Sequence, residues 1–157
     1  MNRRIHPETL PAGALLATYD QPGSYVDCLA ASLPRTVSLP QLINAFYGSR
    51  AFRLERAMIG VALGRKAGDH EVQRLASAKS DQFSAWSVEA RTHDQILLCD
   101  FRGATRSWLM VEAEGGGTTI RFGSAVVDAA GLGFRLLLGF HRLYARLLLG
   151  SALRAIG

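Results

Sequence analysis

Residues 95–127 read QILLCDFRGATRSWLMVEAEGGGTTIRFGSAVV, and this stretch decides the fold. The residue pattern in three segments of this stretch is strand-like rather than helical. Gly103 and the glycine run 115–117 mark the turns between these segments. Strands joined by such short loops must be antiparallel neighbours, because a parallel crossover needs a dozen or more residues. The stretch therefore predicts an antiparallel meander.

The sequence on both sides extends this meander and adds helices. Strands are predicted over 83–91, 94–102, 105–113 and 118–127, after an N-terminal hairpin of 13–20 and 25–33. Between hairpin and meander we expect two or three short helices: one with Ser38 as N-cap, a continuation over 50–63, and one that Asp69 caps and that ends near Ala78. The last 27 residues predict one long helix, apolar around most of its circumference.

Loop parity assigns the meander's side chains to the two faces of the sheet. Two-residue turns at Arg102-Gly103 and Gly115-Gly116 place Trp108 beside Gly123, where a flat ring can cover a bare backbone. The opposite face is more uniformly apolar, so we expect it to meet the C-terminal helix. Trp86 is also expected to point toward that side, from its alternation with polar neighbours.

The order of elements resembles the helix-grip fold of the START-like (SRPBCC, polyketide cyclase-like) superfamily. One segment is similar to that superfamily's meander, in which a strand ending in Glu is followed by a glycine-rich turn, a Thr and another strand. This segment is ATRSWLMVEAEGGGTTIRFGSAVV (104–127). The resemblance covers roughly residues 25–157. It implies an α+β fold with a curved antiparallel sheet wrapped around a long C-terminal helix, and an apolar cavity beneath that helix. Four strands follow the helices here, where the superfamily commonly has six.

A rival fold is the cone-shaped cystatin/NTF-like class, with helices first and a bent sheet after. That class usually finishes on a strand, so a long closing helix argues against it. The 157 residues fit one domain. We expect residues 1–12 to be a loose leader and 13–157 to form a single START-like domain.

Composition narrows the function classes. The net charge of the chain is +5. The basic residues are dispersed, with no run of Lys or Arg longer than two. A nucleic-acid binder concentrates its charge on one face, so nucleic acid is not the expected partner. Arginine outnumbers lysine heavily, which indicates a GC-rich, bacterial coding bias. Arginines interrupt the last helix every turn or two, which argues against an integral membrane span.

The cysteines and the N-terminus indicate a cytoplasmic protein. Cys28 and Cys99 form no CxxC motif and no zinc-type spacing, so we expect two reduced, buried thiols and no metal or other cofactor. Prolines and charged residues interrupt residues 1–12, which breaks the apolar run of a signal peptide. Whether the chain forms a homodimer is left open.

We therefore expect an apolar cavity with a few fixed polar groups, the usual form of a small-molecule site. The ligand would be hydrophobic, aromatic or lipid-like. The candidate cavity residues are Trp86, Ile96, Leu98, Asp100, Ser107, Leu109, Phe122, Ser124 and His141.

Two alternatives stay open. The first is a cyclase- or aromatase-like enzyme in the same cavity, with Asp100, Glu55 or His141 as the candidate acids and bases. Against it, Asp100 and Arg106 are better explained as an ordinary surface pair, and Glu55 as a solvated ion pair. The second alternative is a membrane-surface or interaction protein that uses the apolar C-terminal helix.

Overall fold

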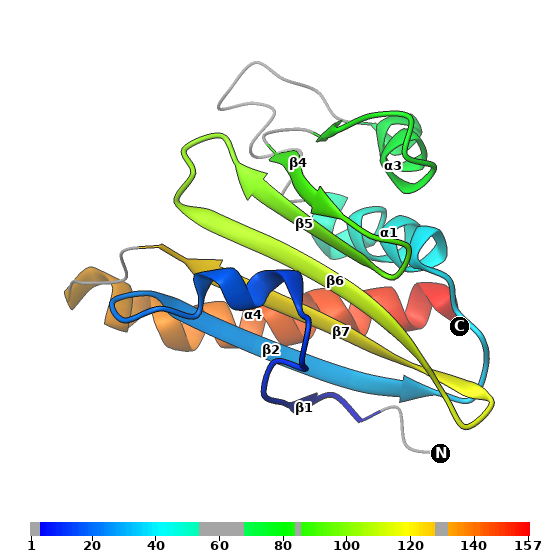
Figure 1. Ribbon diagram of the computed structural model, residues 1–157, viewed down its shortest axis with the longest axis horizontal. Coiled ribbons are helices and arrows are strands. Elements are labelled where there is room, and N and C mark those ends of the chain that lie inside the picture. Colours follow the sequence, from blue (N-terminus) through cyan, green and yellow to red (C-terminus); the bar gives the residue numbers. More distant parts are fainter. Residues whose placement is uncertain (1–3, 54–67, 84–85, 128–131) are drawn as a thin grey trace.

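The computed structural model describes residues 4–53, 68–83, 86–127 and 132–157, and for 132–143 the backbone alone. It has an α+β architecture, with helices packed on a seven-stranded antiparallel sheet (Figure 1). The strands are β1 (His6–Pro7), β2 (Tyr25–Leu33), β3 (Gln82–Phe83), β4 (Trp86–Arg91), β5 (Gln95–Asp100), β6 (Thr105–Glu114) and β7 (Gly117–Val126). The helices are η1 (Leu15–Tyr19), α1 (Leu39–Tyr47), α3 (Asp69–Ala76) and α4 (Leu132–Ile156).

The predicted meander is confirmed. The strand order is β1-β2-β7-β6-β5-β4-β3, and each neighbouring pair is antiparallel. The last strand of the meander, β7, pairs with β2 along nine residues. This pairing joins β2 to the last strand of the meander, so β7 lies inside the sheet between β2 and β6.

The predicted hairpin of 13–20 with 25–33 is wrong in its first half. Residues 15–19 form the 3-10 helix η1, and β2 pairs with β1 and β7 instead. The reason is tertiary. Leu16 is fully buried in a cluster with Trp108, and the Leu15 N–H donates to Gln95 Oε1 at 2.9 Å. These contacts hold the segment across the sheet rather than along its edge.

The turns preserve the predicted alternation of side chains. Gly115 and Gly116 form the two-residue turn between Glu114 and Gly117, and both have positive φ angles, 53° and 83°, as the mirror-image hairpin turns require. The loop between β5 and β6 is longer than predicted, with four residues, 101–104. Four is also an even number, so the facing pairs Leu97–Trp108 and Leu98–Ser107 follow the prediction.

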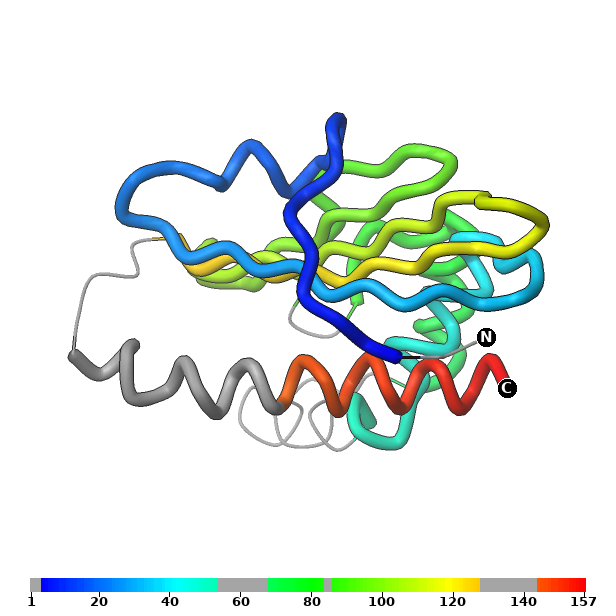
Figure 2. The backbone as a smooth tube through the Cα atoms, turned by 90° about the horizontal axis from the view of Figure 1, so that it is seen from below, coloured from blue at the N-terminus to red at the C-terminus, as the bar shows by residue number. Residues whose placement is uncertain are grey.

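The two faces of the sheet have different covers, as Figure 2 shows. We call the side toward α1 and α4 the helix face and the side toward η1 the outer face. The helix face carries the larger core, with Leu98, Leu109 and Phe122 from the strands. The outer face carries a smaller cluster around Trp108. The more apolar face therefore meets the C-terminal helix, as expected.

The helices on the helix face begin and pack for local reasons. Ser38 and Gln41 form a capping box at the start of α1, which confirms Ser38 as N-cap. In α4, the buried side chains recur at helical spacing and face the core: Ala145, Leu148, Leu149, Ala152 and Leu153. The described C-terminal part of α4 is thus packed rather than protruding. The continuation over 50–63 is helical at 50–53, and its remainder lies outside the described residues.

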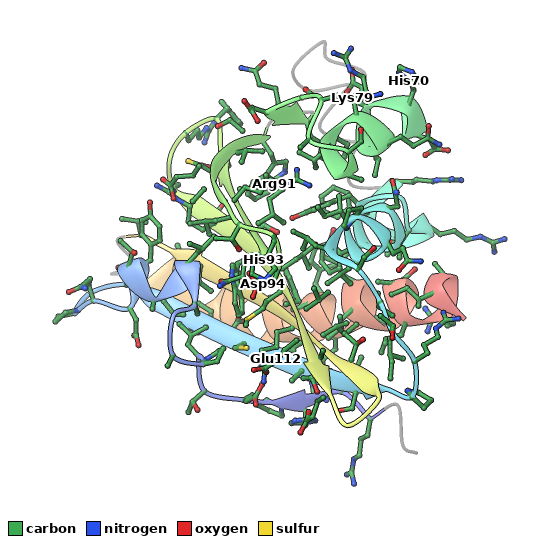
Figure 3. All side chains as sticks on the ribbon, turned by 45° about the vertical axis from the view of Figure 1, so that its right-hand side comes forward. His70, Lys79, Arg91, His93, Asp94 and Glu112 are labelled. Carbon is green, nitrogen blue, oxygen red and sulfur yellow. The ribbon has the colours of Figure 1, made fainter. Side chains whose placement is uncertain are left out.

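Asp69 has a different role from the one predicted. The N-cap of α3 is Gly68, and Asp69 is the first helical residue, with its carboxylate 2.8 Å from the Arg53 guanidinium. The helix ends at Ala76, where Arg91 of β4 donates to the carbonyls of Leu75 and Ala76 at 2.6 and 2.8 Å. Arg91 lies between β4 and this end of α3 in Figure 3. A cation there complements the helix dipole.

The segment expected to be a loose leader is attached to the sheet at residues 6–8. His6 and Pro7 pair with Ala30 and Leu29, and the Glu8 N–H donates to the Cys28 carbonyl at 3.0 Å. Glu8 also accepts from the largely buried Arg121 at 2.7 Å. Arg121 binds Glu112 of β6 at the same distance.

Candidate functional site

A pocket of about 200 Å³ lies between the sheet and α4, on the helix face. We call it the sheet–helix pocket. Its aromatic lining comes from Phe46, Phe52, Trp86, Phe122 and Tyr144. Ala145 and Leu148 of α4 close it on the helix side, and Ser107 and Ser124 provide hydroxyls from the strands. A lining that is mainly apolar with a few fixed polar groups matches the usual form of a small-molecule site.

The strands fix where those hydroxyls lie. Ser107 and Ser124 face each other across β6 and β7, and each is 6% exposed. The Ser107 hydroxyl is 2.8 Å from the Tyr47 hydroxyl of α1, and either oxygen can be the donor. The Ser124 hydroxyl donates to Asp27 Oδ1 at 2.6 Å. Both hydroxyls are therefore held in place by hydrogen bonds, which a buried polar group requires.

Four of the predicted cavity residues line the sheet–helix pocket: Trp86, Ser107, Phe122 and Ser124. Ile96, Leu98 and Leu109 share their face, but they are fully buried in the larger core and lie outside the lining. Loop parity placed six of these residues on one face, and alternation with polar neighbours placed Trp86 there. Neither pattern could tell packed positions from open ones.

Asp100 pairs with Trp86 but is not among the residues that line this pocket. Its Oδ1 accepts from the backbone N–H groups of Ala104 and Thr105 at 2.8 and 3.3 Å, so it organises the turn. Arg106 is not its partner, because Arg106 lies on the outer face with Glu89 at 3.2 Å. Glu55 and the His141 side chain lie outside the described residues.

Sequence reasoning missed Asp27, Tyr47, Phe46 and Phe52. Three of them come from α1 and the segment after it, whose orientation toward the sheet is set by packing. Phe46 and Phe122 have ring centroids 4.6 Å apart, which brings α1 onto β7. The sequence signal for Asp27 was an acidic residue in a largely apolar strand. Such a residue indicates a paired carboxylate, since Asp is rarely buried without a partner.

A second hollow, about 370 Å³, lies between β2 and α4, and we call it the edge groove. Glu8, Asp27, Cys28 and Arg146 contribute to its lining. Burial raises the pKa of the Cys28 thiol to about 12, and the negative charge of Glu8 acts in the same direction. The thiol is therefore protonated at neutral pH, which makes it a poor nucleophile. Cys28 and Cys99 are both free, as expected, although Cys99 is half-buried.

The outer face holds an ion-pair cluster that is structural. Arg106 donates to Glu89 and lies 4.4 Å from the centroid of the Tyr19 ring, while the Tyr19 hydroxyl donates to Glu89 at 2.6 Å. Burial lowers the pKa of Arg106, but hydrogen bonding to Glu89 and Tyr19 outweighs it and the pKa is raised overall. This arrangement anchors the end of η1 to the sheet.

No metal site is formed by the described residues, where no group of three or more His, Cys, Asp and Glu side chains gathers. The described histidines His6, His70 and His93 are exposed. Figure 3 shows His70 at the α3 end of the molecule and His93 in the β4–β5 turn beside Asp94. Within the described part of the chain, no helix has the length and apolar character that crossing a bilayer requires.

Comparisons with known proteins leave the family open. No family model and no curated protein matches the sequence. Among solved structures, the chain is similar to the crystal structure of CalU16 from Micromonospora echinospora, at 12% sequence identity. The match covers 99% of this chain and 92% of that one, with a TM-score of 0.34.

Proposed function

We propose that this chain binds a small apolar or aromatic molecule in the sheet–helix pocket, on a scaffold of the START-like, helix-grip kind. The observation that carries the proposal is the lining itself: five aromatic rings and two hydrogen-bonded serines around about 200 Å³. An apolar cavity of about 150 Å³ accepts benzene. The larger sheet–helix pocket therefore suits a single aromatic ring or a pair of fused rings.

The position of the pocket supports the same conclusion. Its walls come from α1, β4, β6, β7 and α4, elements that are far apart in sequence. Phe46, Phe122 and Leu148 also belong to the larger core, so the walls are held by packing on their far sides. A pocket built on packed elements is preorganised, which lowers the entropy cost of binding.

The two alternative functions receive less support. For the enzyme, Asp100 is bonded to a turn, and a general base must come within hydrogen-bond reach of the substrate. For a membrane-surface role, the described part of α4 places its apolar side chains against the core, which leaves Leu147 as the large hydrophobic residue it exposes. Binding is therefore the function we propose.

The test is a titration with indole, followed by NMR shifts, on the wild type and two variants. Ala145→Leu adds a branched side chain inside the pocket, and Ala155→Leu makes the same change at an exposed position of the same helix. We expect saturable binding to the wild type and to Ala155→Leu, and at least tenfold weaker binding to Ala145→Leu. Melting temperatures establish that each variant is folded.

Two results would overturn the proposal. If indole, naphthalene and similar aromatic probes all fail to bind the wild type, the pocket is not a binding site for this class. If folded Ala145→Leu binds indole as tightly as the wild type, binding occurs elsewhere. Native mass spectrometry of protein purified from its host would add the mass of any retained ligand.

A further inference from the structure

The edge groove and the sheet–helix pocket are neighbours on the helix face. Three lining residues of the groove, on β2, pair directly with three lining residues of the pocket, on β7: Tyr25 with Val126, Asp27 with Ser124, and Leu29 with Phe122. Directly paired residues point to the same face of a sheet. Ala145 of α4 lines both hollows, so its small side chain lies at the boundary between them.

The edge groove places charged side chains beside the apolar pocket. Its charged lining residues are Glu8, Asp27 and Arg146. The two oxygens of Glu8 accept hydrogen bonds from Arg121, at 2.7 and 3.4 Å. Asp27 accepts from the Ser124 hydroxyl at 2.6 Å. Both acids of the groove therefore have partners within the protein.

Arg146 differs from these two acids. Its side chain is exposed, and among the residues that the structure describes no Asp or Glu forms a salt bridge with it. It directly follows Ala145 in α4, so it lies next to the boundary between the two hollows. A guanidinium presents a fork of N–H donors that fits the two oxygens of a carboxylate. The groove thus has a cation that a ligand can reach.

We infer that the edge groove is the second half of the binding site, where Arg146 binds a carboxylate of the ligand. The ligand is then an aromatic acid, with its ring in the sheet–helix pocket and a short chain that passes Ala145 and ends in the carboxylate. This inference rests on the proposed function and adds the class of its ligand. Because Arg146 is exposed, solvent screens the ion pair, and the expected contribution to affinity is modest.

Indole-3-propionate and indole-3-propionamide provide the matched pair for the test. They have the same ring and the same chain, and a carboxylate and a carboxamide have nearly the same shape. At neutral pH only the acid carries a negative charge. An exposed ion pair corresponds to a preference of about two- to fivefold. We expect the wild type to bind the acid more tightly by that factor in NMR titrations at low salt, and added salt should reduce the preference.

Resonances from the two hollows show where each half of the ligand lies. The ring should shift the methyl resonances of Leu148, which lines the pocket. The chain with its carboxylate should shift the backbone amides of Val26 and Cys28, which line the groove. Indole has no chain, so it should shift Leu148 and leave the amides of Val26 and Cys28 unchanged.

Three variants test the role of Arg146. Arg146→Gln removes the charge, so the acid and the amide should bind with equal affinity. Arg146→Lys keeps a positive charge, so part of the preference should remain. Arg154→Gln is the matched control, because Arg154 is another exposed arginine of α4 and is not among the described lining residues of either hollow. The full preference should remain in this control.

The outcomes separate this inference from the proposed function. Equal affinity of the wild type for the acid and the amide, or binding of indole alone, overturns the inference and leaves the proposed function standing. Failure of all three compounds to bind overturns the two together. Binding of the acid without shifts at Val26 and Cys28 shows that the groove is not the second half of the site.

The role of Arg146 has its own contrary results. A folded Arg146→Gln that keeps the full preference, or an Arg154→Gln that loses it, overturns that role. A preference that added salt does not weaken also overturns it, and this measurement needs only the wild type.

Discussion

The two faces of the sheet are covered in different ways, and the difference separates stability from the proposed binding. On the outer face, η1 fills the surface around Trp108, and polar groups specify the fit. Gln95 Oε1 accepts from Trp108 Nε1 and from the Leu15 N–H, both at 2.9 Å, and Gln95 Nε2 donates to the Gly13 carbonyl at 3.1 Å. On the helix face, aromatic and aliphatic side chains pack around the sheet–helix pocket.

The two surfaces around β7 also differ in how closely they are packed. On the outer face a Cβ added to Gly123 would meet Leu16 at 2.6 Å and Trp108 at 2.8 Å, so that surface is filled. On the helix face, one residue further along β7, Ser124 lines a space of about 200 Å³. Gly123 therefore lies in a filled surface, while the adjacent Ser124 lines an open pocket. Substitutions on the outer face should change stability, and those at the pocket should change binding.

The two tryptophans give the largest expected difference. Trp108 is fully buried on the outer face, and Trp86 is half-buried at the pocket. Trp108→Ala should lower the free energy of unfolding by about 3–5 kcal/mol, because it leaves a cavity and removes one of the hydrogen bonds of Gln95. Trp86→Ala should lower it by about 1–2 kcal/mol, since less apolar area is lost. Urea unfolding followed by circular dichroism measures both; equal losses would contradict the contrast between the faces.

Two glycines give a smaller difference of opposite sign. Gly123→Ala should destabilise the protein by about 1–3 kcal/mol, because its Cβ would also lie 2.8 Å from the Asp27 carbonyl. Gly150→Ala in α4 has its nearest neighbours at 3.6 and 3.7 Å. An alanine there should stabilise the helix by about 0.5–1 kcal/mol.

The same unfolding experiment measures the glycine pair. A neutral Gly123→Ala would show that the outer face can relax around a methyl group. In that case close packing around Trp108 would not explain a loss of stability on substitution at the outer face.

Much of the sheet could be predicted from the sequence, because each hairpin of the meander is a local pattern. A strand-like residue pattern and the glycine turns located β5, β6 and β7, and parity placed Trp108 beside Gly123. The β5–β6 loop has four residues instead of two, and the faces still came out as predicted because both numbers are even.

The remaining features depend on contacts between distant segments. The segment 13–20 is η1 rather than a strand because Gln95 and Trp108, some 80 to 90 residues away, determine where it packs. At the pocket, parity identified Ser107 and Ser124, but not Tyr47 or Asp27, whose positions require α1 and β2 to be placed against them. Asp100 was assigned to the cavity although an Asp before a glycine turn often bonds the turn's own backbone.

The central claim is that open space lies at the sheet–helix pocket and not around Trp108 on the outer face. Xenon tests it most directly, because it enters apolar cavities without needing a specific hydrogen bond. Methyl NMR spectra recorded under xenon pressure should show saturable shifts for Leu148, which lines the pocket. The methyls of Leu16 and Leu97, in the outer cluster, should stay unchanged. Shifts at Leu16 and Leu97 with none at Leu148 would contradict the account.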